Sequence, residues 1–183
     1  MNNHLSLQGK VAVVTGAGRG IGRAIAIGYA NAGASVCCAA RTVAEIEAVA
    51  DQINAGGGRT IAVSTDVTNL ASVEAMFEQV QTELGGLDIV VINAGVNSDK
   101  RTVEEGNSED WVATTNVNLT GAYYCARAAT PYLKQRGAGK IITIGSGLGH
   151  RGTPKRSAYA CSKAGLWMLT RTLAQELWPT TSV

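Results

Sequence analysis

Three side chains near the end of the chain have types and spacings suited to moving a proton. Tyr159 and Lys163 lie four positions apart, and Ser146 precedes Tyr159 at the end of an apolar run. Positions i and i+4 share one face of a helix, so a phenol and an ammonium would project side by side. A tyrosine has an ordinary pKa of about 10, and a neighbouring cation favours its charged form. The hydroxyl of Ser146 could hold a substrate oxygen while a proton is exchanged.

A glycine-rich turn follows the first apolar run of the chain. It reads Thr15-Gly16-Ala17-Gly18-Arg19-Gly20-Ile21-Gly22 and opens a helical pattern, although its spacing departs from Gly-x-Gly-x-x-Gly. Glycines let a backbone turn sharply and approach a pyrophosphate, whose charge is met by amides at the start of the helix. A purely structural turn would not require all four glycines, so this segment favours nucleotide binding.

The residues after the second apolar run bear on which dinucleotide would bind. In an NAD site a carboxylate about 20 residues beyond the glycine turn binds the ribose, whereas an arginine there accepts a 2′-phosphate. Ala40 and Arg41 occupy this place, and Arg19 adds a second basic group in the glycine turn. We therefore expect NADP(H) to be favoured over NAD(H).

Two further apolar runs end in polar turns. Asp66-Val67 follows the third run, and Asn93-Ala94-Gly95 follows the fourth. Taken alone, an Asp or Asn after a strand is usually a turn former. In a parallel sheet, however, both turns would border a ligand bound beyond the carboxyl ends of the strands.

Short apolar runs alternate with helical patterns along the chain, which predicts an α/β fold with a doubly wound parallel sheet and helices on both faces. The expected strands are Val11–Thr15, Ser35–Ala39, Thr60–Ser64, Ile89–Ile92 and Lys140–Ile144. The expected helices are Ile21–Ala32, Val43–Ala55, Leu70–Leu84, Ser108–Arg136 and Ser157–Leu177, several closed by Gly33, Gly56, Gly85 and Gly137. With no repeat or linker, residues 1–183 read as one domain.

Composition and charge exclude several classes of protein. A net charge of +2 is too small to favour a nucleic-acid partner. Long apolar stretches and a secretory pattern are absent, so we expect a cytoplasmic protein with no membrane segment. Four cysteines without a Cys-x-x-Cys pair, together with two histidines, indicate neither a disulfide framework nor a metal site. We expect Cys161 to be a small packed residue, because no histidine is placed to activate it.

Together these motifs resemble the short-chain dehydrogenase/reductase family, from Lys10 to about Pro179. The resemblance depends on the glycine turn, the two polar turns, Asn118 in Val117-Asn118-Leu119-Thr120-Gly121, Ser146, and the pair of Tyr159 and Lys163. It implies a Rossmann-like fold and an NAD(P)-dependent oxidoreductase that acts on a ketone or secondary alcohol, most like 3-oxoacyl-acyl-carrier-protein reductases. Sugar, polyol and other secondary alcohol dehydrogenases share these motifs. A non-catalytic dinucleotide-binding sensor or scaffold is the alternative from another class.

The resemblance also implies a role for each matched residue. Tyr159 would be the general acid and base, Lys163 would bind the nicotinamide ribose, and Ser146 would position the carbonyl. Asn118 would help to hold a water that relays protons to Lys163. The implied cofactor contacts, besides Tyr159 and Lys163, are Gly16, Gly18, Arg19, Gly20, Ile21, Gly22, Arg41, Asp66, Val67, Asn93, Ala94 and Gly95.

Three implications concern the rest of the molecule. Relatives continue through further strands and a segment that covers the substrate, so we expect either a fragment or a protein that lacks this lid. In both cases we expect this chain to be poorly active or unstable alone unless a partner covers the edge of its fifth strand. The two long helices pair between subunits in relatives, which implies a homodimer or homotetramer. A loop with His150, Arg151, Lys155 and Arg156 fits an acidic carrier but also an ordinary solvated loop, and leaves the substrate open.

Overall fold

A five-stranded parallel sheet forms the centre of the molecule in the computed structural model, which describes residues 6–97 and 100–181. The strands lie in the order β3-β2-β1-β4-β5. Their bounds are β1 Val11–Thr15, β2 Ser35–Ala40, β3 Arg59–Ser64, β4 Ile89–Ile92 and β5 Lys140–Thr143. The order reverses direction between β1 and β4, and the crevice beyond such a reversal is where ligands bind in doubly wound folds.

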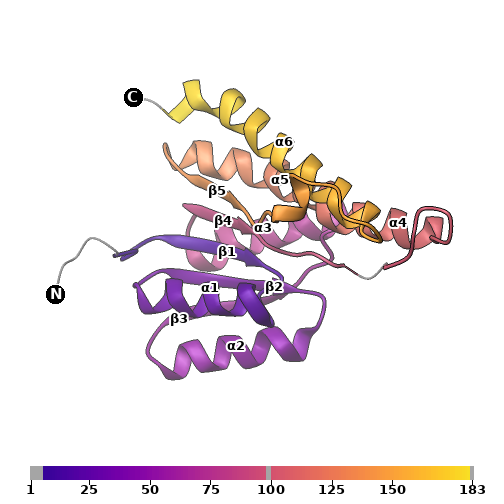
Figure 1. The fold of residues 1–183 in the computed structure, drawn as a ribbon. Helices are drawn as coiled ribbons and strands as arrows, with labels where there is room; N and C mark the ends of the chain where they lie inside the picture. The colour runs from indigo at the N-terminus through magenta and orange to yellow at the C-terminus, as the bar shows by residue number, and fades with distance from the viewer. Residues whose placement is uncertain (1–5, 98–99, 182–183) are drawn as a thin grey trace.

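Helices cover both faces of this sheet. The two helices on one face are α1 Gly20–Asn31 and α2 Val43–Ala55; the other face carries α3 Leu70–Leu84, α5 Gly121–Gln135 and α6 Ser157–Thr181 (Figure 1). Strand residues alternate between the two cores. Val13 and Cys37 pack with α3 and α5, whereas their neighbours Val14 and Cys38 pack with α1 and α2. The expected α/β fold is therefore confirmed, and the strand and helix ends differ from expectation by a few residues.

The segment expected to be one helix over 108–136 is not a single regular α-helix. It consists of α4 Ser108–Thr115, a π-helical turn at Asn116–Thr120, and α5. A π turn inserts an extra residue into the helix and re-aims the side chains around it. Directly after the π turn, the start of α5 lies close to the loop after β3, since a Cβ at Gly121 would lie only 2.8 Å from Val67 Cγ2.

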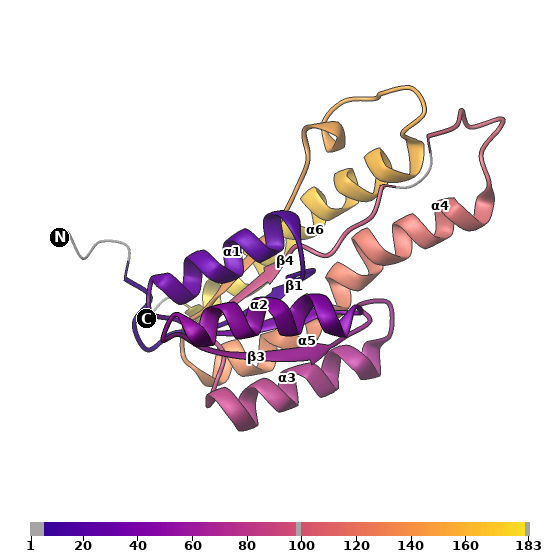
Figure 2. The same ribbon diagram turned by 90° about the horizontal axis from the view of Figure 1, so that it is seen from below.

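Two helical segments project beyond the sheet at the end where the strands finish. Figure 2 shows α4 and the first turns of α6 extending together from the body of the fold, and the two helices contact each other. This end also carries the loops that follow β4 and β5. Side chains from α6 are thereby brought over the carboxyl ends of the strands.

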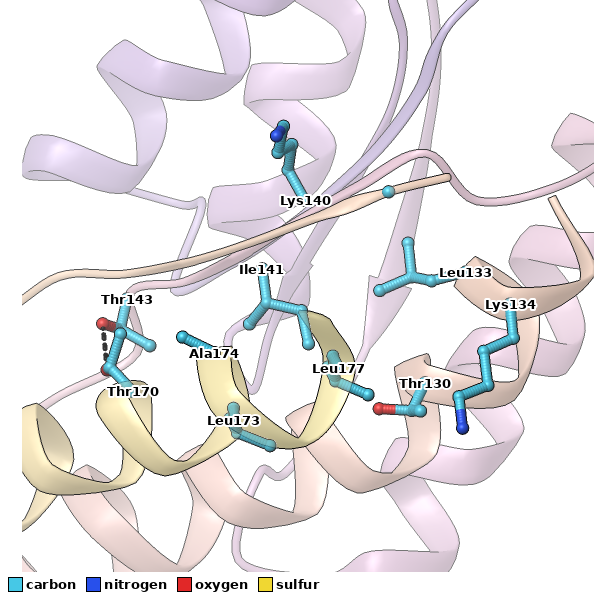
Figure 3. Close-up of a pocket in the computed structure, with 11 residues that line it drawn as sticks. Thr130, Leu133, Lys134, Lys140, Ile141, Thr143, Thr170, Leu173, Ala174 and Leu177 are labelled. Carbon is cyan, nitrogen blue, oxygen red and sulfur yellow. Dashed lines mark hydrogen bonds between the residues drawn. The ribbon is translucent and has the colours of Figure 1, made fainter. Parts of the chain in front are cut away.

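A small apolar groove lies between β5, α5 and α6. Its volume is about 250 Å³, and Leu133, Ile141 and Leu177 point into it from α5, β5 and α6 (Figure 3). Thr143 and Thr170 close one end with a 2.8 Å hydrogen bond between their hydroxyls. Ile142, on the opposite face of β5, is 37% exposed.

Among the described residues, no helix is long and apolar enough to cross a membrane.

Candidate active site

A cavity of about 540 Å³ lies at the carboxyl ends of the strands. Residues from every expected cofactor-binding segment line it: Gly16, Gly18, Arg19, Gly20, Ile21, Arg41, Asp66, Val67, Asn93, Ala94, Gly95, Tyr159 and Lys163. Three expected site residues, Gly22, Asn118 and Ser146, do not belong to this lining. Gly22 lies against Gly16 and Asn118 hydrogen-bonds Val96, both of which line the cavity.

The glycine turn is built by close approach of backbone to backbone. Gly16 has a φ of +66° and Gly20 a φ of +55°, in the left-handed region that other residues rarely adopt. Gly22 is buried beneath the turn, where a Cβ would lie 2.2 Å from the Gly16 carbonyl oxygen. The turn can therefore lie close against the first residues of α1, where a helix has amide groups that no carbonyl of the same helix binds.

Thr15 and Asn93 lock the glycine turn to the loop after β4. The hydroxyl of Thr15 accepts hydrogen bonds from the backbone amides of Asn93 (3.0 Å) and Ala94 (3.1 Å). The side-chain amide of Asn93 donates to the carbonyl of Thr15 at 2.8 Å and to that of Gly16 at 3.2 Å. The expected role of Asn93 as a direct cofactor contact therefore competes with a structural role, since its amide is already engaged by the turn.

Two arginines and two acids surround the cavity beyond β2. Arg19 and Arg41 are exposed, and both line the cavity together with Glu45 and Asp66. Hydrogen bonds from the Thr68 amide and hydroxyl to Asp66 hold the pKa of this carboxyl below its ordinary value despite some burial, and the charge of Arg41 adds to the effect. Asp66 is thus ionised at neutral pH and partly balances Arg41.

Tyr159 and Lys163 project from the same face of α6, as their spacing predicts. Lys163 is only 5% exposed, and its Nζ lies 5.8 Å from the centre of the Tyr159 ring. Nζ donates a 2.7 Å hydrogen bond to the carbonyl of Ile144, directly after β5. Burial lowers the pKa of Lys163, which makes its proton easier to exchange than that of a solvated lysine.

A buried hydrogen-bond chain joins the π turn to α6. Asn118 accepts from the Val96 amide at 2.8 Å and donates to the Val96 carbonyl at 2.9 Å. Its amide also donates to Ser162 Oγ at 3.0 Å, and Ser162 in turn donates to the Tyr159 carbonyl at 2.8 Å. Asn118 therefore holds the loop after β4 and the helix of Tyr159 at once. Ser162 was not expected from the sequence, although it lies between the two motif residues.

Ser146 lies on the loop after β5, beside the cavity. Its hydroxyl accepts a 3.2 Å hydrogen bond from the Leu148 amide and caps a short 3₁₀ turn at Gly147–Gly149. This turn packs directly on α6, because a Cβ at Gly149 would lie 2.8 Å from the Lys163 carbonyl carbon. The structure thus places Ser146 next to the helix of Tyr159 and Lys163, with its oxygen engaged by the loop itself.

One of the four cysteines is exposed, contrary to expectation. Cys161 is exposed rather than packed, because its side chain lies on the solvent side of α6. The next residue, Ser162, lies on the buried side of the same helix. Cys37, Cys38 and Cys125 are buried, and burial raises the pKa of all three thiols, that of Cys125 to about 12. In the part of the chain that the structure describes, no three His, Cys, Asp or Glu residues gather as metal ligands.

Residues 10–183 match the family model described as short chain dehydrogenase. A short-chain type dehydrogenase/reductase from Picea abies is 40% identical over 179 residues, which cover 93% of this chain and 66% of that protein. The 3-oxoacyl-[acyl-carrier-protein] reductase FabG of Pseudomonas aeruginosa is 40% identical over 173 residues, which cover 94% and 70% of the two chains.

A solved structure with the same fold has a dinucleotide bound. It is a Beutenbergia cavernae protein assigned as an NAD(P) dependent gluconate 5-dehydrogenase, with NADP at low occupancy. It superposes with a TM-score of 0.89 at 40% identity, over 96% of this chain and 70% of that one. This chain thus spans about two thirds of the length of these relatives. By its sequence, its sheet order and the residues around its cavity, the chain belongs to the short chain dehydrogenase family.

Proposed function

We propose that the chain forms the dinucleotide-binding part of an NAD(P)(H)-dependent oxidoreductase that interconverts a ketone and a secondary alcohol. One observation carries the proposal: Tyr159 and Lys163 line the same cavity as the glycine turn, so an acid/base pair and a phosphate cradle face one space. Residues that act together on a bound substrate must meet in this way.

The residues around the cavity fit a dinucleotide. The glycine turn and the start of α1 would hold the pyrophosphate, and a side chain at Gly16 would meet Asn93 Nδ2 at 2.9 Å. The loop Asn93-Ala94-Gly95 would border the adenosine half, and Lys163 would bind the ribose next to the nicotinamide. When bound, the nicotinamide supplies or accepts the hydride.

The protein residues then manage the proton. Tyr159 gives a proton to the carbonyl oxygen during reduction and takes it back during oxidation. The ammonium of Lys163, held by the Ile144 carbonyl, favours the phenolate that forms in between. Asn118 and Ser162 fix the helix turn that carries Tyr159. Ser146 turns its hydroxyl from the Leu148 amide to the substrate oxygen.

NADP(H) is the favoured cofactor in this proposal. Arg19 and Arg41 both line the cavity at the end where the adenosine ribose would lie, and arginine pairs well with phosphate oxygens. The substrate class is that of a 3-oxoacyl thioester, supported by the similarity to the Pseudomonas aeruginosa reductase. A sugar acid or other secondary alcohol is the second candidate, supported by the equal similarity to the Beutenbergia cavernae protein.

A homodimer or homotetramer is part of the same proposal. Large apolar side chains are exposed on two adjoining helices, Trp111 and Val112 on α4 and Trp167 and Met168 on α6. Exposed apolar side chains on adjoining helices are stabilised when a second subunit covers them.

Replacing the proposed acid/base tests the function. In the full-length protein, Tyr159→Phe should lower kcat at least about 100-fold, because the phenolic proton is lost, while NADPH still binds. Fluorescence titration with NADPH and turnover with ketones and 3-oxoacyl thioesters measure the two effects. Tyr123→Phe, an equivalent change at an exposed position of α5, is the control and should leave both unchanged.

The same assays separate the enzyme from a sensor or scaffold. If Tyr159→Phe keeps near-normal turnover, the acid/base assignment is wrong. If the unmodified full-length protein binds NADPH but turns over no compound of either class, a non-catalytic dinucleotide-binding role replaces the proposal.

A further inference from the structure

Glu45 lies against the glycine turn from the neighbouring helix. It belongs to the first turn of α2, one helical turn after Arg41, and it lines the cavity. A Cβ at Gly18 would lie 2.7 Å from Glu45 Cβ and 2.8 Å from its Oε2. The carboxylate therefore folds back over Gly18, into the space that the absent side chain leaves.

This position brings a negative charge to the part of the cavity with the two arginines. Arg19 follows Gly18 in the turn, and Arg41 is the first residue of the connection from β2 to α2. Asp66 already interacts electrostatically with Arg41. Among the described residues, no ion pair joins Glu45 to either arginine. The carboxylate of Glu45 therefore acts on this region through space, without being neutralised by a partner.

We propose that Glu45 sets the discrimination between NADPH and NADH, by opposing a 2′-phosphate that Arg19 and Arg41 attract. The inference rests on the proposed dinucleotide site. The two cofactors differ only in this phosphate, so a nearby carboxylate repels NADPH selectively and leaves NADH almost unaffected. The two arginines favour the phosphate and the carboxylate opposes it, so Glu45 reduces the preference for NADPH that the arginines alone would give.

A simpler role for Glu45 is stabilisation of α2. An acidic side chain in the first turn of a helix interacts favourably with the helix dipole. That role predicts a loss of stability when the charge is removed, with the same effect on both cofactors. Only the role in discrimination predicts a change in the ratio of their affinities.

The test uses Glu45→Gln, which removes the charge and keeps the shape of the side chain. In the full-length protein the ratio of NADH Kd to NADPH Kd should rise roughly three- to tenfold, through tighter NADPH binding. The rise should shrink at high salt, because screening weakens the repulsion. Glu47→Gln is the matched control: it makes the same charge change two residues later on an exposed part of α2.

A second variant separates the charge from the packing. Glu45→Asp keeps the negative charge, so its Kd ratio should stay closer to that of the unmodified protein than to that of Glu45→Gln. The inference is overturned if Glu45→Gln changes the ratio no more than Glu47→Gln does, or if Glu45→Asp changes it as much as Glu45→Gln does. If the unmodified protein binds neither cofactor, the proposed function itself fails, and the inference fails with it.

Discussion

Ser162 connects two parts of the site through one hydroxyl. It is fully buried, accepts from Asn118 and donates to the backbone carbonyl of Tyr159. Both the donor and the acceptor capacity of the hydroxyl are therefore used, and both serve the turn of α6 that carries Tyr159. A serine in the middle of a helix has no recognisable pattern, which is why the sequence did not predict this contact.

We predict that Ser162→Ala lowers kcat about tenfold and leaves NADPH binding nearly unchanged. The change frees the Tyr159 carbonyl and removes one acceptor from Asn118, at a cost of about 1–2 kcal/mol of stability. Steady-state kinetics and NADPH titration measure the split between kcat and Kd. Thr172→Ala, which removes an exposed hydroxyl bonded only to its own helix, should change neither. An unaltered kcat in Ser162→Ala would show that the chain of hydrogen bonds does not position Tyr159.

Residue types and spacing predicted which residues line the cavity better than they predicted the hydrogen bonds that the site residues make. Tyr159 and Lys163 face the cavity together, as an i and i+4 pair must. Ser146 lies beside the cavity, and its oxygen caps a local turn. This contact depends on the path of the loop, which residue types and spacing do not predict. The exposure of Cys161 was wrongly predicted, since the side of α6 facing the core depends on how the helix is placed on the sheet.

At the scale of the elements, the glycines of α1 have opposite environments. A side chain at Gly22 would collide with the Gly16 carbonyl and with Asn93 Nδ2, whereas nothing lies within 4 Å of a Cβ at Gly28. Gly22 is therefore required by the contact between the glycine turn and α1, and Gly28 is only tolerated by the helix.

This contrast gives a paired prediction. Gly22→Ala should destabilise the protein by at least about 2 kcal/mol, because the glycine turn must move. Gly28→Ala should stabilise it by about 0.5–1 kcal/mol, because alanine is the better helix former. Denaturant unfolding of both variants measures the difference. Equal effects of the two substitutions would contradict the packing seen around Gly22.

Regular elements were predictable, and the irregular one was not. The buried runs of β1 and β4 and the glycine-closed α3 follow directly from apolar pattern and turn chemistry. The π turn at Asn116–Thr120 depends on contacts made by Asn118 with Val96 and Ser162, which are distant in sequence. Helical periodicity alone cannot reveal an inserted residue whose stabilising partners lie elsewhere.

At the scale of the whole molecule, Asp88 joins three elements at the end of the sheet opposite the cavity. It accepts from the Val11 amide at 2.9 Å, from Lys10 at 3.3 Å and from Arg136 at 3.3 Å. Burial raises the pKa of Asp88, but these hydrogen bonds outweigh burial and leave the pKa below its ordinary value. The ionised form therefore stabilises the fold.

The direction of this shift fixes the pH dependence. The stabilisation is complete above the unfolded pKa, about 3.9, and is lost as pH falls through the lower folded value. Asp88→Asn should thus lose about 1–3 kcal/mol at pH 7, and the difference from the unmodified protein should shrink below about pH 4. Urea unfolding between pH 2.5 and 7 measures it, with the exposed Asp51→Asn as control. A pH-independent difference would refute the role of the charge.

The hydrogen bond from Lys163 to Ile144 connects the site to the edge strand of the sheet. Ile144 directly follows β5 and donates its amide to the Ile92 carbonyl, so the residue that continues the pairing with β4 also anchors the ammonium. A substitution that displaced this edge strand would therefore also displace the carbonyl that holds the ammonium. The edge of the sheet and the buried cation thus share one residue of backbone.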